Sequence, residues 1–481
     1  MVESVSRRKY IAVAGAAAAA AVIGGAAYYL TRPAPPAPTP TLTPKPTPKP
    51  TTTPTPAPTP VEIVKLKYFN HQYYEFKPMW ERTIPKFESK NPGIKIDFYG
   101  APWAEAMDKL IVELQSSSPP DVFNIPWTPY TPLIPFMEPL DEYIERYNWP
   151  VDEIALQKEF PGTWPKEMGG DGKTYQANMM NAEESALIYR KDIFKEKGIP
   201  DPEEEGYPHW SLDEFLDVVR KCTYTKSDGT KVFGYAFPTN PADGMSRWTE
   251  DWIDYLYSAG GGLVRPERPG EIICGKDPYL KANVEVGEFM RTLVREELVP
   301  VGTVKPKYFE MQILGRVAMA RHGPWQFGTF KETHPEQLPN VGATLLPFFG
   351  KGWNYTDQTG AGGHGMAKAG KHKEEAFKFI DFTMSKECLL SFAEELFWLP
   401  CNMTILTDEY FDKYPFMKAF VEAAKISKTH LIGFTLKGFE AQSNEMWKAH
   451  FDTQQKIINT DEDIEGLYIQ LQERLETIAK E

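Results

Sequence analysis

The chain has 481 residues, of which 42% are hydrophobic and 25% are charged, and its formal net charge is −13. A chain of this length is too long for one simple core, so we expect two lobes or domains. The acidic balance argues against a nucleic-acid partner, because phosphate binding needs a clustered basic surface.

The first sixty residues are expected to lie outside the fold. A twin-arginine-like sequence precedes an apolar stretch, Ile11 to Leu30, that is long enough to span a bilayer as a helix. Residues 31–60 are almost wholly Pro, Thr and Ala, which predicts an extended stalk. We therefore expect residues 1–30 to be an export signal or membrane anchor, with the uncleaved anchor favoured over secretion. The body would then lie outside the cell.

From Val61 onward the pattern is that of an α/β protein. Strands are predicted at 63–69, 94–98 and 121–125, and amphipathic helices at 78–90 and 103–116. A capping box at Ser211 and Glu214 opens a further helix, and residues 371–386 form another. This alternation predicts a mostly parallel sheet built from right-handed βαβ units.

Motifs for cofactors and metals are incomplete. Gly170 to Thr174 resembles a phosphate-binding loop, but Glu167 stands where its first glycine is required. Residues 360–365 fit G-x-G-x-x-G, yet no helix begins within them, and the histidines are scattered. We expect no cofactor and no metal. The four cysteines leave open two disulfides (222–274 and 388–401), other pairings, or free thiols.

Carboxylate pairing does not favour an enzyme. Glu183 and Glu184 are adjacent in an extended segment, so their side chains face opposite sides of it. They cannot flank one glycosidic bond as an acid and a base. We expect no catalytic residues.

Loops after the first three strands are the expected binding region, since ligands of open α/β sheets bind at the carboxyl ends of strands. These loops combine amide groups with aromatic rings, which suits a sugar because it offers hydroxyls to hydrogen-bond and a C–H face to stack. Their candidate ligand-binding residues are Asn70, His71, Gln72, Tyr73, Trp103 and Trp127.

Six segments then resemble one family. In chain order they are Asp171–Gln176, Ala186–Phe194, Pro208–Phe215, Gly315–Met319 with Gly323–Trp325, Gly363–Lys368 with Glu375–Ile380, and Leu399–Pro400. Together they resemble the maltose-binding-like extracellular solute-binding proteins of ABC importers. Arg190 departs from the pattern, which usually has Asn there.

The resemblance implies a two-lobed periplasmic-binding-protein-like α/β fold whose lobes close around a ligand. The implied lobes are 61–178 with 351–396, and 182–346 with 399–481, and the crossings lie near 176–182, 345–350 and 397–399. By family position the candidate ligand-binding residues also include Glu183, Trp248, Trp325, Gly363 and Trp447. The implied role is capture of a sugar by a monomer that delivers it to an ABC permease.

Three alternatives stay open. A polyamine could occupy the same fold, with Glu183 and neighbouring aromatic rings holding its cations. A surface enzyme that degrades polysaccharides, or an adhesin that uses the stalk, would be a protein of another class.

Overall fold

The computed structural model describes residues 63–125, 131–149, 162–163, 171–181, 185–240, 250–265, 267–268, 270–352, 356–357, 361–426, 428–429, 431–432, 435–436, 439 and 442–480. The predicted signal or anchor and the predicted stalk lie outside these residues. No helix within the described ranges is both long and apolar enough to cross a bilayer.

The first sheet holds the strands predicted at the start of the body. Its order is β13-β5-β12-β3-β1-β2, and β4 pairs with β5 at one side. β1 is parallel to β2 and β3, whereas β12 is antiparallel to β3 and β5. The strands are β1 (Val64–His71), β2 (Ile94–Ala101), β3 (Val122–Ile125), β4 (Gly162–Thr163), β5 (Thr174–Asn181), β12 (Ala361–Met366) and β13 (Leu399–Pro400).

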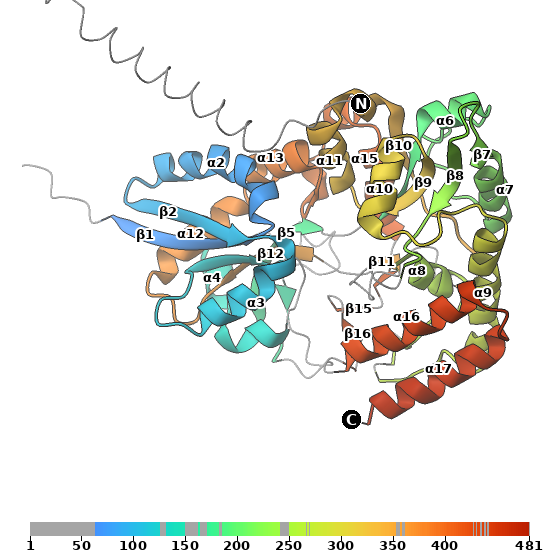
Figure 1. Cartoon of the computed structure of the whole chain (residues 1–481). Helices are drawn as coiled ribbons and strands as arrows, with labels where there is room; N and C mark the ends of the chain where they lie inside the picture. The colour runs from blue at the N-terminus through green and yellow to red at the C-terminus, as the bar shows by residue number, and fades with distance from the viewer. Residues whose placement is uncertain are drawn as a thin grey trace, which may run out of the picture. The chain divides into compact units, whose positions relative to one another are not determined.

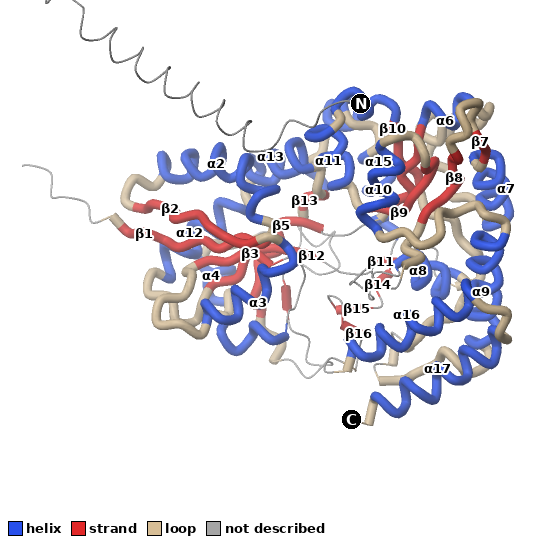
Figure 2. Tube along the Cα trace, viewed as in Figure 1, coloured by secondary structure: helices blue, strands red, loops and turns tan. Residues whose placement is uncertain are grey.

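The second sheet has the order β10-β6-β9-β8-β7, in which β8 and β9 run parallel. Its strands are β6 (Ala186–Arg190), β7 (Tyr224–Thr225), β8 (Lys231–Ala236), β9 (Val317–His322) and β10 (Val341–Thr344). Figure 2 shows these two groups of strands with helices around them. Short pairs join β11 (Thr356–Asp357) to β14 (Lys428–Thr429) and β15 (Leu431–Ile432) to β16 (Thr435–Leu436).

Helices cover both sheets (Figure 1). In the N-terminal half they are α2 (Tyr73–Lys90), α3 (Trp103–Leu114), η1 (Thr131–Phe136), α4 (Asp141–Arg146), α6 (Lys191–Glu196), α7 (Leu212–Cys222) and α8 (Glu250–Ser258). Those that follow are α9 (Tyr279–Arg295), α10 (Lys305–Ile313), α11 (Trp325–Thr333), η3 (Pro335–Asn340), α12 (Lys373–Thr383), α13 (Lys386–Leu396), η4 (Met403–Ile405), α14 (Asp408–Lys413), α15 (Met417–Ile426), α16 (Ser443–Asn459) and α17 (Ile464–Ile478).

Most of the predicted elements are present, and α2 shows where the pattern misleads. We expected a helix from Pro78, because proline favours the first turn. The helix instead begins at Tyr73 and keeps both Pro78 and Pro85 in its interior. Each proline removes one backbone hydrogen bond, but burial of Phe76, Met79 and other apolar side chains on the sheet offsets that loss.

The chain passes from the first sheet to the second after β5, leaves the second sheet after β10, and leaves the first sheet again after β13. These changes of sheet lie in or close to the segments where crossings were expected. Two α/β lobes joined by crossings are therefore present, as predicted from the sequence.

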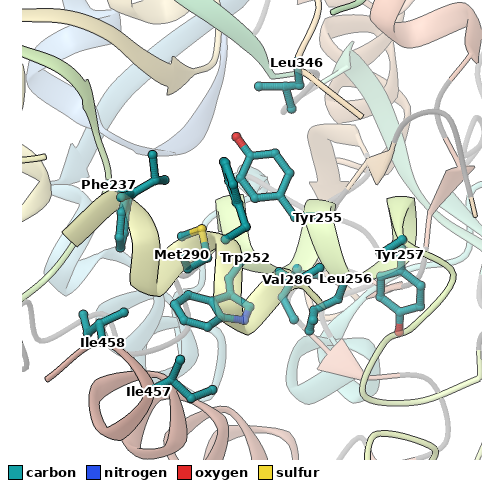
Figure 3. Packing of buried hydrophobic residues seen from close by; sticks show 14 of the residues in the cluster. Phe237, Trp252, Tyr255, Leu256, Tyr257, Val286, Met290, Leu346, Ile457 and Ile458 are labelled. Atoms are coloured by element: carbon teal, nitrogen blue, oxygen red, sulfur yellow. The ribbon is translucent and has the colours of Figure 1, made fainter. Parts of the chain in front are cut away.

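Hydrophobic clusters fill both lobes and the region between them. One cluster spreads from β1 and α2 through α13 and α11 to β6 and β10, so apolar packing is continuous between the two sheets. A second cluster lies under α8, α9, α16 and α17 (Figure 3), where Trp252 of α8 packs near Met290 and Ile458. The indole nitrogen of Trp252 also donates to the hydroxyl of Tyr468 at 3.0 Å.

All four cysteines are free and buried, so the two disulfides considered from the sequence are absent. Burial raises the pKa of Cys222, Cys274 and Cys388 to about 12, which keeps these thiols protonated and unreactive at neutral pH. They act as small apolar side chains within the cores.

Arg190, the departure from the family pattern, anchors the end of α10. Its guanidinium donates to the carbonyl oxygens of Gln312 (3.1 Å) and Ile313 (2.8 Å), and to the carboxylate of Asp192 at 2.9 and 2.8 Å. The arginine is almost fully buried. It therefore supplies a donor to the carbonyl of Ile313 in the last turn of α10, and a second donor to the carbonyl of Gln312, which also accepts from the amide of Gly315 at 3.0 Å.

We predict that Arg190→Ala lowers the free energy of unfolding by roughly 2 kcal/mol, because the carbonyl of Ile313 loses its donor and that of Gln312 loses one of two. Arg220→Ala is the matched control, since Arg220 pairs with Glu296 where both side chains are at least 40% exposed. The control should change stability by about 0.5 kcal/mol or less. Denaturant unfolding of both variants checks this, and equal losses would contradict the anchoring role of Arg190.

Candidate functional site

A pocket of about 530 Å³ lies where α2, α11 and the end of α13 meet. Helices α2, α13 and α11 are neighbours in the upper part of Figure 1, and α13 contacts both of the others. The pocket is lined by Gln72, Glu75, Phe76, Pro78, Met79, Arg82, Trp325, Gly328, Thr329, Lys331, Glu332, Glu395, Leu396 and Trp398. It therefore takes side chains from a helix of the first lobe, a helix that follows a strand of the second lobe, and a crossing segment.

The junction of β1 and α2 brings Gln72 to the pocket. Gln72 has a left-handed backbone (φ 51°), and its carbonyl accepts the first hydrogen bond of α2 from the amide of Phe76 at 3.1 Å. Beside it, Gly100 lies so close to the carbonyl of Asn70 that a Cβ there would overlap the oxygen. The tight approach of β1 and β2 thus requires glycine at this position.

The turn from β9 into α11 sets the position of Trp325. Pro324 precedes the helix, and the Trp325 ring folds back over Gly323, where any Cβ would overlap it. One face of the ring stacks on Trp398, with the ring centroids 4.9 Å apart and the planes 25° from parallel. Trp325 stays half-buried, so it can offer an aromatic surface to a ligand.

Trp398 lies on the crossing segment between α13 and β13. Phe397, the residue before it, has a left-handed backbone (φ 55°) that turns the chain out of the helix. Trp398 is 5% exposed and also meets the edge of Phe76 at 6.0 Å. Reasoning from the sequence missed Trp398 as a lining residue, although it falls within the predicted crossing at 397–399.

Charges of both signs surround the pocket. Arg82 and Glu395 form an ion pair. Burial, and second the neighbouring positive charges, lower the pKa of Lys331 below its usual range. Two further carboxylates, those of Glu75 and Glu332, belong to the lining. The pocket therefore combines stacked indoles and one amide with three carboxylates and two cationic side chains, and suits a polar molecule that has an apolar face.

Of the predicted ligand-binding residues whose side chains the structure describes, Gln72 and Trp325 lie in this pocket. Asn70 and His71 are fully buried behind it. Tyr73 turns toward β2, where its ring lies 5.1 Å from that of Phe98.

The other predicted residues lie elsewhere. Gly363 is buried in β12, and a Cβ there would overlap the carbonyl of Ala177, which gives this glycine a packing role. Trp447 is 3% exposed and belongs to the second core. Trp103 opens α3, but its side chain is outside the described set, as are Trp127, Glu183 and Trp248 entirely.

Two α/β lobes that are joined by crossings and contribute jointly to one pocket define the architecture of a two-lobed binding protein. The family model described as bacterial extracellular solute-binding protein matches residues 71–387, which is more than half of the chain. The chain therefore belongs to the bacterial extracellular solute-binding proteins.

Relatives agree with this assignment. A binding protein of Brucella abortus (strain 2308) is 25% identical over 356 residues, covering 71% of this chain and 77% of the relative. Among solved structures, the fold is similar to that of an ABC substrate-binding protein from Listeria monocytogenes in complex with cycloalternan (TM-score 0.65, 19% identity, 86% of this chain and 99% of that one). It is also similar to that of a Thermotoga lettingae solute-binding protein bound with α-D-tagatose (TM-score 0.64, 18% identity, 86% and 99%).

The stacked indoles give the site a spectroscopic signature. Two indoles at this separation couple their electronic transitions, so we expect an exciton couplet in the far-ultraviolet circular dichroism spectrum. We predict that Gly323→Ala removes this couplet, because the new methyl group must displace the Trp325 ring. Trp398→Phe should remove the same feature from the spectrum.

Gly466→Ala is the control for this prediction. Gly466 lies in the first turn of α17, and a Cβ there would approach only the side chain of Asp463, whose Oδ2 would lie 3.1 Å away and would have to shift slightly. The couplet should remain in this variant. A couplet that survives in Gly323→Ala would show that the Trp325 ring does not depend on the glycine.

Proposed function

We propose that this protein is the substrate-binding component of an ABC importer and that it captures a sugar or oligosaccharide between its two lobes. The observation that carries the proposal is the pocket shared by Gln72, the residue before α2, and Trp325 of α11. A sugar ring has a flat C–H face for the exposed side of an indole and hydroxyls for an amide. Gln72, at the β1–α2 junction, supplies the amide, and Trp325 of α11 supplies the indole.

Closure follows from that arrangement. A ligand that contacts both helices favours the conformation in which they are close together, so binding shifts the equilibrium toward a closed form. The proposed lobes are residues 61–178 with 351–396 and residues 182–346 with 399–481. In the closed form the protein, acting as a monomer, would dock on permease subunits without making or breaking a bond in the ligand.

The charge of the pocket supports a neutral ligand over a polyamine. A polycation would be expected to select a site lined mainly by carboxylates and aromatic rings. Here Arg82 and Lys331 lie among the carboxylates of the lining, and Arg82 already pairs with Glu395. The sugar ligands of the Listeria and Thermotoga neighbours point the same way.

The proposed function includes a location for the protein outside the cytoplasm. A solute-binding protein of an importer acts outside the cytoplasm, and an anchor at Ile11–Leu30 followed by the stalk at 31–60 would tether it near its permease. Retention of residues 11–30 in native protein that fractionates with membranes would support the tether, whereas a mature N-terminus near Thr31 would contradict it.

A thermal-shift screen of the purified full-length protein against sugars and polyamines tests the ligand class. Saturating ligand stabilises the native state by mass action, by about 2.7 kcal/mol at one hundred times its Kd. We predict that a neutral saccharide raises the melting temperature. Its affinity should change little between 0.1 M and 1 M salt, since stacking and neutral hydrogen bonds are weakly screened.

We further predict that Trp325→Ala weakens binding of that saccharide by at least ~2 kcal/mol in titration calorimetry. Trp149→Ala is the matched control, because Trp149 is also half-buried and stacked, on Phe377 at 5.2 Å, but does not line the pocket. The control should lower stability and leave affinity nearly intact. Strong salt dependence with an unaffected Trp325→Ala would overturn the sugar assignment in favour of a polyamine.

A further inference from the structure

The end of β1 holds a residue in a costly conformation. Gln72 is not glycine, yet its backbone is left-handed (φ 51°), which costs about 1–2 kcal/mol relative to the right-handed region. The same residue lines the ligand pocket. Its surroundings must therefore supply interactions that hold the chain in this conformation.

Asn70 supplies one of these interactions. Its amide is satisfied when its oxygen faces the indole nitrogen of Trp80 (3.2 Å) and the hydroxyl of Tyr68 (2.8 Å), and its nitrogen then donates to the carbonyl of His71. That carbonyl belongs to the peptide that joins His71 to Gln72. The buried side chain of Asn70 therefore fixes the peptide whose orientation sets the backbone of Gln72.

A hydrogen-bonded chain orients Asn70 in turn. The Tyr68 hydroxyl lies 2.8 Å from Nε2 of His364 on β12, and Nδ1 of His364 lies 3.2 Å from the hydroxyl of Thr383 on α12. Because Tyr68 gives its proton to Asn70, it accepts from Nε2–H of His364. The chain thus connects α12, through the first sheet, to the β1–α2 junction.

All members of this chain are fully buried. Burial, and second the nearby His71, lower the pKa of His364 to about 3, so its imidazole is neutral at neutral pH. A neutral imidazole has one donor and one acceptor: Nε2–H donates to Tyr68, and Nδ1 faces the Thr383 hydroxyl, whose single proton also lies toward the carbonyl of Ile380 at 2.6 Å. In a dry interior each unsatisfied polar group would be costly, so the network favours one arrangement of its members.

We propose that Tyr68, Asn70 and His364 are positioning residues of the ligand pocket, which hold Gln72 at its wall without touching the ligand. This inference rests on the proposed function for the identity of the ligand and extends it to the residues that set affinity from behind the pocket. The amide oxygen of Gln72 is enclosed, and its amide nitrogen can donate to a ligand hydroxyl only while the backbone keeps the left-handed turn.

Tyr68→Phe tests the proposal with the loss of a single oxygen atom. We expect the Kd for the saccharide found in the screen to rise about fivefold or more, equivalent to about one lost hydrogen bond. Gln72→Ala should weaken binding in the wild type but add little in the Tyr68→Phe background, because the two residues act as one unit.

Tyr257→Phe is the matched control. Tyr257 is also buried, and its hydroxyl donates to the carbonyl of Val264 at 2.7 Å, far from the pocket lining. It should lower the melting temperature by a similar amount and leave the Kd unchanged. A Kd that responds equally to both variants, or to neither, would overturn the positioning role.

Hydrogen exchange in the unliganded protein separates this proposal from the proposed function. Tyr68→Phe should speed exchange of the amides at the start of α2, first that of Phe76, which is bonded to the carbonyl of Gln72. Tyr257→Phe should not. Unchanged exchange at Phe76 in Tyr68→Phe would overturn the positioning role even if no sugar binds, whereas absence of any sugar ligand alone would count against the proposed function.

Discussion

The stacked pair of Trp325 and Trp398 is the contact on which the pocket depends. Trp325 begins the helix that follows a strand of the second sheet, and Trp398 precedes β13 of the first sheet. Their stacking therefore places an aromatic surface where the chain passes between the lobes. Gly323 lets the ring fold back, and the left-handed turn at Phe397 directs the chain that carries the partner ring. A movement of one lobe against the other would separate the two indoles unless both rings moved together.

Opposite the indoles, the pocket relies on buried polar groups. The β1–α2 junction places Gln72 by means of side chains that are neutral and fully enclosed, whereas the charged residues of the lining lie on the helices around it. Neutral groups beneath the pocket and charged groups around it agree with the free energies of burial. An uncompensated buried charge destabilises the folded protein far more than a hydrogen-bonded amide or imidazole does. The buried hydrogen bonds that hold Gln72 and the aromatic surface of Trp325 together give a preorganised binding site.

Local patterns predicted only part of the fold, and the expectation of a mostly parallel sheet is wrong, because most strand pairs of the two large sheets are antiparallel. The alternation of β1, β2 and β3 with α2 and α3 identified the parallel part of the first sheet, because period-2 and period-3.6 patterns are local properties. The start of α2 was wrong by five residues, since tertiary packing kept Pro78 inside the helix. The antiparallel strands β5, β12 and β13 come from distant parts of the chain, and no local pattern specifies such pairing.

The residues of the site were also hard to predict from the sequence, because their contacts join distant parts of the chain. Residue type and loop position placed Gln72 and Trp325 among the candidates, but the same criteria selected Asn70 and Trp447, which the fold buries. Whether an aromatic ring or an amide faces a pocket or a core depends on neighbours far along the chain. Trp398 shows the converse, because it lines the pocket only through its stack with a residue more than seventy positions earlier.

The central claim is that ligand is held between the two lobes and draws them together. Cysteines introduced at the exposed positions Val112 on α3 and Ile469 on α17 can carry spin labels, because the four native thiols are buried and burial raises the pKa of each of them. Double electron–electron resonance then measures the distance between the lobes with and without saturating saccharide. The account predicts a shorter and narrower distance distribution in the bound protein, and a distribution that ligand leaves unchanged would contradict it.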